Sequence, residues 1–229
     1  MSDGCALRPV ARIRSDFPSK FGIPRQSGLV AELSARVVFE PEFRNPDALR
    51  GIDGFSHLWL IWEFSESVRG EWSPTVRPPR LGGNTRLGVF ATRSPFRPNP
   101  IGLSSVRLER VELSAPDGPE LIVSGADLMD GTPIFDIKPY IPYADCHADA
   151  SAGFTGGAGD FLLSVDFPAE LLSRLPEDKR GAVLGVLSHD PRPAYQNDDE
   201  RVYGFVFAGF EIKFTVAGSR LTVKSAERV

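Results

Sequence analysis

The stretch His57-Leu-Trp-Leu-Ile-Trp-Glu-Phe64 is a short apolar run between turn-forming residues and predicts a β-strand. Similar short runs, separated by Gly and Pro, flank it: Val10–Arg14, Ala35–Glu40, Leu87–Thr92, Leu103–Leu113, Glu120–Gly125 and Phe161–Phe167. In the last of these runs apolar residues alternate with other residues, which is typical of a half-buried strand. Because no long helical pattern lies between the runs, they favour a mainly β barrel or sandwich, although turn-rich α+β folds look similar.

The composition changes at Ser151–Gly159, where small residues predict a flexible connection. The elements expected after it are the helices Ala169–Leu175 and Glu177–Ser188, a long strand Val202–Val216 with a bulge at Gly209, and a strand Leu221–Lys224. We therefore expect two domains, a β-barrel over residues 1–155 and a small α+β domain over residues 160–229.

Length and composition exclude several classes of protein. The chain has 229 residues, of which 41% are apolar, so it can form a core and is not disordered throughout. The first residues hold no apolar stretch typical of a secretory signal, and the apolar runs are too short to span a membrane. Cys5 and Cys146 make no disulfide framework, which favours a reducing cytoplasm. The three histidines are too scattered to indicate a metal site.

The charge of the chain is unevenly distributed. The net charge of −4 argues against a nucleic-acid partner, but arginines far outnumber lysines. Six arginines and a single acid, Glu71, lie between Arg69 and Arg97, in loops stiffened by proline. Stiff loops that carry arginine are suited to binding phosphate or carboxylate, because the side chains are presented with little ordering cost. The alternative is a solvated basic face.

Two further clusters could carry chemistry. The sequence Asp130-Gly-Thr-Pro133 predicts a turn, and a carboxylate beside it, such as Asp127, could accept the hydroxyls of a ribose. Asp190-Pro-Arg-Pro-Ala-Tyr195 follows the last helix and presents an Arg and an aromatic ring on extended backbone, which suits contact with phosphates and bases. The alternatives are a simple turn between strands and a stiff connector.

Several motifs together resemble TrmO, the TsaA-like family of tRNA methyltransferases. They are Phe21–Gln26, Arg50-Gly51, Phe55–Trp59, Thr75–Asn84, Gly88–Ser94, Phe96–Gly102, Asp130–Pro133, Asp136–Tyr140 and Asp190–Tyr195. The resemblance covers nearly the whole chain. It implies a cytoplasmic homodimer, built on a β-barrel, that uses S-adenosylmethionine to methylate the exocyclic nitrogen of N6-threonylcarbamoyladenosine next to the anticodon of tRNA.

The resemblance implies which residues bind the cofactor, and the chemistry of the reaction suggests candidates for the other roles. The cofactor would be bound by Pro24, Arg25, Gln26, Ser65, Glu66, Arg93, Leu103, Asp127, Leu128, Met129 and Asp130. The nitrogen nucleophile needs an acceptor for its proton, and the candidates for this catalytic role are Asn99, Asp136 and Tyr140. The residues expected to contact tRNA are Arg77, Arg80, Arg86, Arg97, Lys138, Arg192 and Tyr195.

Two other functions remain open at the level of sequence. The arginine-rich loops and the segment Asp190–Tyr195 could belong to an RNA-binding module without catalytic activity. The chain could also be an enzyme that acts on a free nucleoside bearing a carboxylate. A non-catalytic module has no reason to bind S-adenosylmethionine, which separates it from the methyltransferase.

Overall fold

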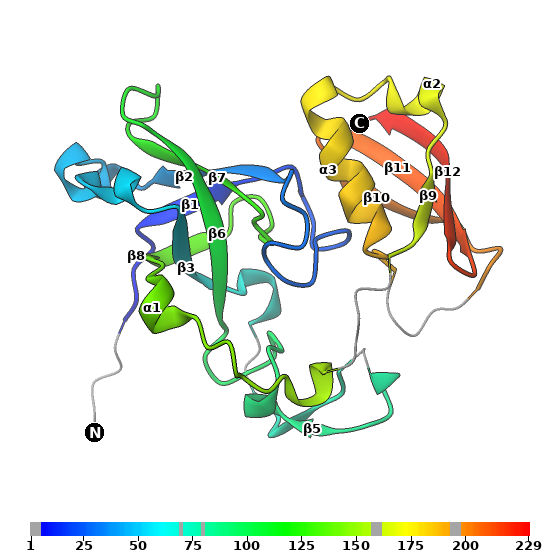
Figure 1. Cartoon of the computed structure of the whole chain (residues 1–229), viewed down its shortest axis with the longest axis horizontal. Helices are drawn as coiled ribbons and strands as arrows, with labels where there is room; N and C mark the ends of the chain where they lie inside the picture. Colours follow the sequence, from blue (N-terminus) through cyan, green and yellow to red (C-terminus); the bar gives the residue numbers. More distant parts are fainter. Residues whose placement is uncertain (1–5, 69–70, 79–80, 157–161, 193–197) are drawn as a thin grey trace.

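The computed structural model describes residues 6–68, 71–78, 81–156, 162–192 and 198–229. It consists of a closed barrel of six strands and a separate four-stranded sheet covered by helices (Figure 1). The barrel strands, in spatial order, are β1 (Ala11–Arg14), β2 (Ser34–Phe39), β7 (Glu120–Ser124), β6 (Ile101–Glu112), β3 (His57–Glu63) and β8 (Pro133–Pro139). All neighbouring strands are antiparallel. The expected barrel and its mainly β character are confirmed.

Alternation of side chains along the strands builds the barrel core. On β3, Leu58, Leu60 and Trp62 are buried inside, whereas the residues between them are half-buried on the outer face. Trp62 lies opposite Gly102 of β6 in the strand register. A Cβ atom on Gly102 would lie 2.3 Å from the Trp62 ring, so the indole lies directly against bare backbone at this end of the barrel.

One expectation for the first half of the chain was wrong, and one barrel strand was not expected. Of the predicted strand Leu87–Thr92, only Leu87–Gly88 (β5) is extended, and it pairs with Thr75–Val76 (β4) outside the barrel. Val89–Ala91 is a 3-10 turn, which the backbone N–H and hydroxyl of Thr92 close by donating to the Val89 carbonyl. The sixth barrel strand is β8, which was not among the expected strands, and proline stands at both of its ends.

The second half forms the sheet β10-β11-β12-β9, with β9 parallel to β12. Its elements are β9 (Ser164–Asp166), α2 (Ala169–Leu172), α3 (Glu177–Ser188), β10 (Tyr203–Phe207), β11 (Phe210–Ala217) and β12 (Arg220–Arg228), and α1 (Pro142–Asp145) precedes them. The predicted helix Glu177–Ser188 is confirmed. The predicted bulged strand Val202–Val216 is instead a hairpin, because Ala208 and Gly209 both adopt positive φ and turn the chain.

Short 3-10 helices connect many of the strands. They span Pro41–Phe43, Pro46–Leu49, Ile52–Gly54, Ser65–Ser67, Val89–Ala91 and Gly153–Thr155. The loop between β1 and β2 is longer than these connections and contributes to a different core. Its residues Phe17, Val30 and Leu33 are buried in the hydrophobic core of the second sheet and not in that of the barrel. The two halves of the chain therefore share this loop.

The contact between Trp62 and Gly102 predicts a large effect of Gly102→Ala. The new methyl group would overlap the indole, and overpacking of this kind costs about 1–3 kcal/mol of unfolding free energy. Urea denaturation measures the loss. Gly54→Ala is the matched control, because no atom lies within 4 Å of a Cβ built there. Equal unfolding free energies for the two variants would contradict the packing described for Trp62.

Candidate functional site

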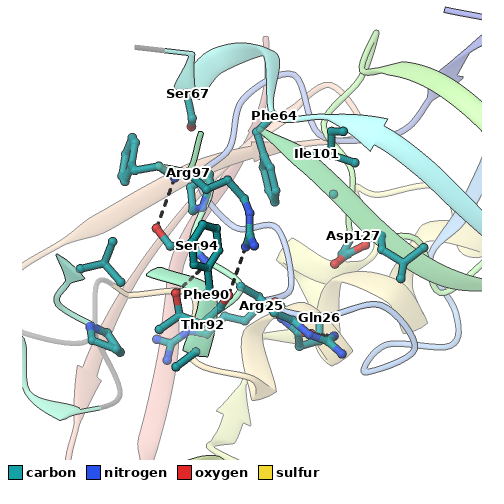
Figure 2. A pocket seen from close by; sticks show the side chains of 18 of the residues that line it. Arg25, Gln26, Phe64, Ser67, Phe90, Thr92, Ser94, Arg97, Ile101 and Asp127 are labelled. Atoms are coloured by element: carbon teal, nitrogen blue, oxygen red, sulfur yellow. Dashed lines mark hydrogen bonds between the residues drawn. The ribbon is translucent and has the colours of Figure 1, made fainter. Parts of the chain in front are cut away.

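A cleft of about 1890 Å³ lies at one end of the barrel, where β3 and β6 meet the loops that follow β1 and β3 and precede β6 (Figure 2). The residues predicted to bind the cofactor line this cleft, with the exception of Leu128 and Asp130. Those that line it are Pro24, Arg25, Gln26, Ser65, Glu66, Arg93, Leu103, Asp127 and Met129. Residues from five separate parts of the sequence therefore meet in one place.

The two exceptions have structural contacts. Leu128 is buried in the barrel core. The carboxylate of Asp130 accepts a hydrogen bond from the backbone N–H of Ser15 at 3.0 Å and lies 3.6 Å from Arg14. The predicted turn at Asp130 is confirmed, because the N–H of Thr132 donates to the carbonyl of Met129. This turn fixes the loop that carries Asp127 to the end of β1.

Asp127 is held by a chain of hydrogen bonds that begins inside the barrel. Trp62 Nε1 donates to Ser104 Oγ at 2.9 Å, and Ser104 Oγ donates to Asp127 Oδ1 at 2.6 Å. Burial raises the pKa of the Asp127 carboxyl above its ordinary value, while the hydrogen bond from Ser104 and the charge of Arg93 oppose the rise. The side chain faces the cleft (Figure 2). The cleft therefore contains an oriented carboxylate that can accept a hydrogen bond or a proton.

Arg93 and Gln26 connect two walls of the cleft. Arg93 Nη1 donates to Gln26 Oε1 across 67 residues of sequence. Arg25, the neighbour of Gln26, donates to the backbone carbonyl of Arg192 at 3.3 Å. The loop before β6 and the loop after β1 are thus joined at the point where both face the cleft.

The other arginines of the cleft differ from those on the barrel exterior. Arg86 donates to the hydroxyl of Thr75 at 3.2 Å and Arg97 to the carbonyl of Thr92 at 3.1 Å, while Arg77 is exposed. Within the described residues, none of these three makes an ion pair with an acidic side chain, whereas exterior arginines such as Arg12 do. The cleft arginines therefore retain charge that a bound anion could neutralise.

The remaining predicted residues lie in different places. Asn99 lines the cleft. Asp136 and Lys138 form an ion pair at 3.0 Å on β8 and do not line it. Tyr140 packs against Trp59 and His57 beside α1, also outside the cleft lining. Arg80 and Tyr195 lie outside the described residues.

Arg192 is bound within its own turn. Its Nε and Nη2 atoms both donate to the carboxylate of Asp190, each at 2.9 Å, and its side chain is only 10% exposed. The hydrogen bonds to Asp190 raise the pKa of the guanidinium, so it stays charged. In this conformation Arg192 contacts Asp190 and Arg25.

Sequence reasoning missed several residues of the site. Phe64 and Phe90 line the cleft, as do Ala152–Thr155, which belong to the stretch predicted as a flexible connection. Ser104 and Trp62 had no local signal, since their contact joins residues 42 apart in the sequence. Only the alternation expected for a strand could have placed Trp62 inside the barrel.

Two negative findings apply to the described part of the chain. In the ranges given above, no group of three or more His, Cys, Asp and Glu side chains is arranged to hold a metal ion. No helix in the same ranges has the length and apolar character needed to cross a bilayer.

Comparison with known proteins gives matches over nearly the whole chain. A protein from Escherichia coli K12 named tRNA (adenine(37)-N6)-methyltransferase is 43% identical over 223 residues, covering 94% of each chain. A protein of the same name from Eikenella corrodens is 45% identical over 163 residues, covering 71% of this chain and 91% of that protein. The crystal structure of TrmO from Pseudomonas aeruginosa superposes with a TM-score of 0.76 at 32% identity, covering 98% of this chain and 99% of that chain.

Family models agree with these matches. The model of the tRNA-methyltransferase O N-terminal domain matches residues 12–146, which include the barrel and most of the cleft. The model of the TrmO C-terminal domain matches residues 161–229, which include the second sheet. Both halves of the fold, in the same order, are therefore accounted for by a single family, and the chain belongs to the tRNA-methyltransferase O (TrmO) family.

Proposed function

We propose that the protein transfers a methyl group from S-adenosylmethionine to the exocyclic N6 of N6-threonylcarbamoyladenosine next to the anticodon of tRNA. The observation that carries the proposal is the cleft, in which an oriented carboxylate and arginines without acidic partners lie together. Relatives that match 94% and 71% of this chain are named tRNA (adenine(37)-N6)-methyltransferases, which supports the same reaction. The expected location is the cytoplasm, where such a tRNA substrate is found.

The lining of the cleft fits the cofactor. S-adenosylmethionine, when bound, supplies an electrophilic methyl carbon together with a ribose, a carboxylate and an ammonium group. Pro24 to Gln26, Arg93, Leu103 and Asp127 would hold it, because they combine apolar surface with a guanidinium and a half-buried carboxylate in one cleft. Arg93 suits an anionic group, and Asp127 suits hydroxyl or ammonium donors.

The chain's own residues would position the nucleophile and orient its N6–H group through a hydrogen bond, and the proton released on methylation would pass to solvent. Methyl transfer is an in-line displacement, so catalysis depends chiefly on position and charge complementarity. Asn99 lines the cleft, and its side-chain oxygen can accept a hydrogen bond from the N6–H group. The cleft arginines would bind the threonyl carboxylate and nearby phosphates.

Asn99→Ala tests whether Asn99 accepts the hydrogen bond from N6–H. If the variant binds cofactor and methylates at the rate of the wild type, Asn99 does not have this role.

We also propose that the protein is a homodimer, as the resemblance implies. Trp72 and Phe90 are exposed beside the cleft with ring centroids 6.3 Å apart, and Leu103 is exposed on its wall. Apolar side chains gathered in this way are typical of a contact surface. Sedimentation equilibrium tests the proposal, and a monomer at all concentrations would contradict it.

The function is tested by mass analysis of nucleosides. Purified tRNA with and without the threonylcarbamoyl group is incubated with the protein and S-adenosylmethionine, then digested. We expect a gain of one methyl group on the modified adenosine alone. Methylation of the free modified nucleoside as readily as of tRNA would favour a small-molecule enzyme. Absence of both methylation and cofactor binding by calorimetry would favour a non-catalytic RNA-binding module.

Asp127→Asn should change how stability depends on pH. Since burial raises the pKa of Asp127, the folded wild type favours the protonated carboxyl and loses stability as the pH rises from below the ordinary aspartate value to neutrality. The variant lacks this loss, because an amide does not titrate in this range. Urea denaturation across the pH range measures it, with Asp117→Asn as an exposed control. Parallel curves for wild type and Asp127→Asn would contradict the burial argument.

Asp127→Asn should also bind S-adenosylmethionine more weakly.

Arg77→Ala should weaken tRNA binding and reduce its dependence on salt. If Arg77 contacts a phosphate, its loss lowers the slope of log affinity against log salt by about one. Arg8→Ala is the control, because Arg8 is exposed but already pairs with Glu42 at 3.3 Å. Filter binding over a salt series measures both slopes. Equal slopes for Arg77→Ala and the wild type would remove Arg77 from the tRNA contact.

A further inference from the structure

The loop between β1 and β2, residues 16–33, belongs to two parts of the molecule at once. Phe17, Val30 and Leu33 are buried in the core of the second sheet, and Phe21 and Ile23 pack against that core. The blue loop in Figure 1 lies between the barrel and α3. A segment that is N-terminal in sequence is therefore folded as part of the C-terminal half.

Polar contacts fix both ends of this loop to the C-terminal half. Lys179 Nζ of α3 lies 2.7 Å from Asp16 Oδ2, and both side chains are mostly buried. The backbone carbonyl of Asp16 accepts from the N–H of Ala208 at 3.0 Å. His189 Nε2 lies 3.0 Å from the carbonyl oxygen of Leu29, and because a carbonyl only accepts, this nitrogen carries the proton.

Packing between these contacts leaves little free space. A Cβ on Gly22 would lie 2.4 Å from the ring of Phe205 on β10, so the phenyl group lies against the loop backbone. A Cβ on Gly185 would lie 2.6 Å from Val30, so α3 approaches the loop equally closely. The residues just before Pro24 are thus seated on the second sheet.

The opposite side of the same loop faces the barrel and the cleft. The N–H of Asp130 donates to the carbonyl of Phe17, and the N–H of Gly28 donates to the carbonyl of Gly125, each at 2.8 Å. These bonds flank the segment that carries Asp127. Ile23 to Gln26 line the cleft between them. The loop therefore joins the core of the C-terminal half to the wall of the cleft.

We infer that the C-terminal half is the scaffold of the cofactor site, with His189, Lys179 and Phe205 as positioning residues for Pro24 to Gln26, although none of the three lines the cleft. The inference rests on the proposed function, because it takes these loop residues to bind S-adenosylmethionine. A loop of this length without such contacts would have to be ordered on binding, which costs affinity. Holding the loop in advance removes that cost.

The test uses the full-length chain with His189→Leu and His189→Gln. Leucine removes the N–H donor to Leu29, whereas glutamine keeps a donor of similar reach. We expect His189→Leu to raise the dissociation constant of S-adenosylmethionine, measured by calorimetry, and the KM for it by about fivefold. The kcat at saturating cofactor should stay within about twofold, since the reacting groups are unchanged. His189→Gln should restore most of the affinity.

A second pair of variants tests the same inference independently, in case a substitution at His189 prevents folding. Lys179→Met breaks the ion pair to Asp16 and should weaken cofactor binding, whereas Arg220→Met breaks the 2.7 Å pair to Asp166 inside the second sheet and should not. Unchanged affinity in both His189→Leu and Lys179→Met, with a cofactor-binding wild type, overturns the inference. Loss of affinity in Arg220→Met to the same degree also overturns it. A wild type that binds no cofactor overturns the proposed function instead.

Discussion

Closure of the barrel through β8 is the constraint on which the site depends. β8 pairs with β3 on one edge and with β1 on the other, so without it the five remaining strands would be an open sheet. To reach that position from the end of β7, the chain must cross the end of the barrel through residues 125–132. This crossing places Asp127 at the mouth of the barrel, directly above Ser104 and Trp62. The carboxylate is therefore positioned by the topology of the barrel.

The same crossing connects the barrel to the loop after β1. The backbone of Gly125 and of Asp130 bonds to that loop on either side of Asp127. Since the loop is also buried in the core of the second sheet, the position of the cleft wall depends on residues more than 160 positions away, as in the Asp16–Lys179 pair. A change in the C-terminal half that moved α3 would move the cleft wall with it.

The sequence predicted those elements whose signals are local. The helix Glu177–Ser188 is bounded by prolines and was found at its observed limits. β8 was missed because its turn and prolines suggest an irregular segment, and its pairing on both edges comes from distant strands. The hairpin at Ala208 was read as a bulge, since a single glycine supports either conformation and the positive φ of Ala208 has no signal in the sequence.

The residues of the candidate cofactor site were predicted from the family resemblance, and most of them lie together in the structure. The periodicity of apolar residues predicted none of these residues. Nine of the eleven residues predicted to bind the cofactor line the cleft, yet the hydrogen bonds that orient Asp127 come from Trp62 and Ser104, which no motif marks. Contacts of this kind depend on strand register, which a single sequence fixes only through the alternation of buried residues. Motifs therefore indicate the residues that line the cleft, whereas strand register decides which residues, such as Ser104 and Trp62, hold those side chains in place.

The distribution of charge explains how an acidic protein can serve an RNA substrate. The net charge is −4, but exterior arginines such as Arg12 and Arg36 are neutralised by glutamates at 2.8 and 3.2 Å. In the described part of the cleft, Arg77, Arg86 and Arg97 have no such partner, so the positive potential is concentrated where the loops are stiffened by proline. Because screening by salt acts within about 10 Å, the nearby field decides binding more than the total charge does. An anionic substrate would therefore be attracted to this end of the barrel.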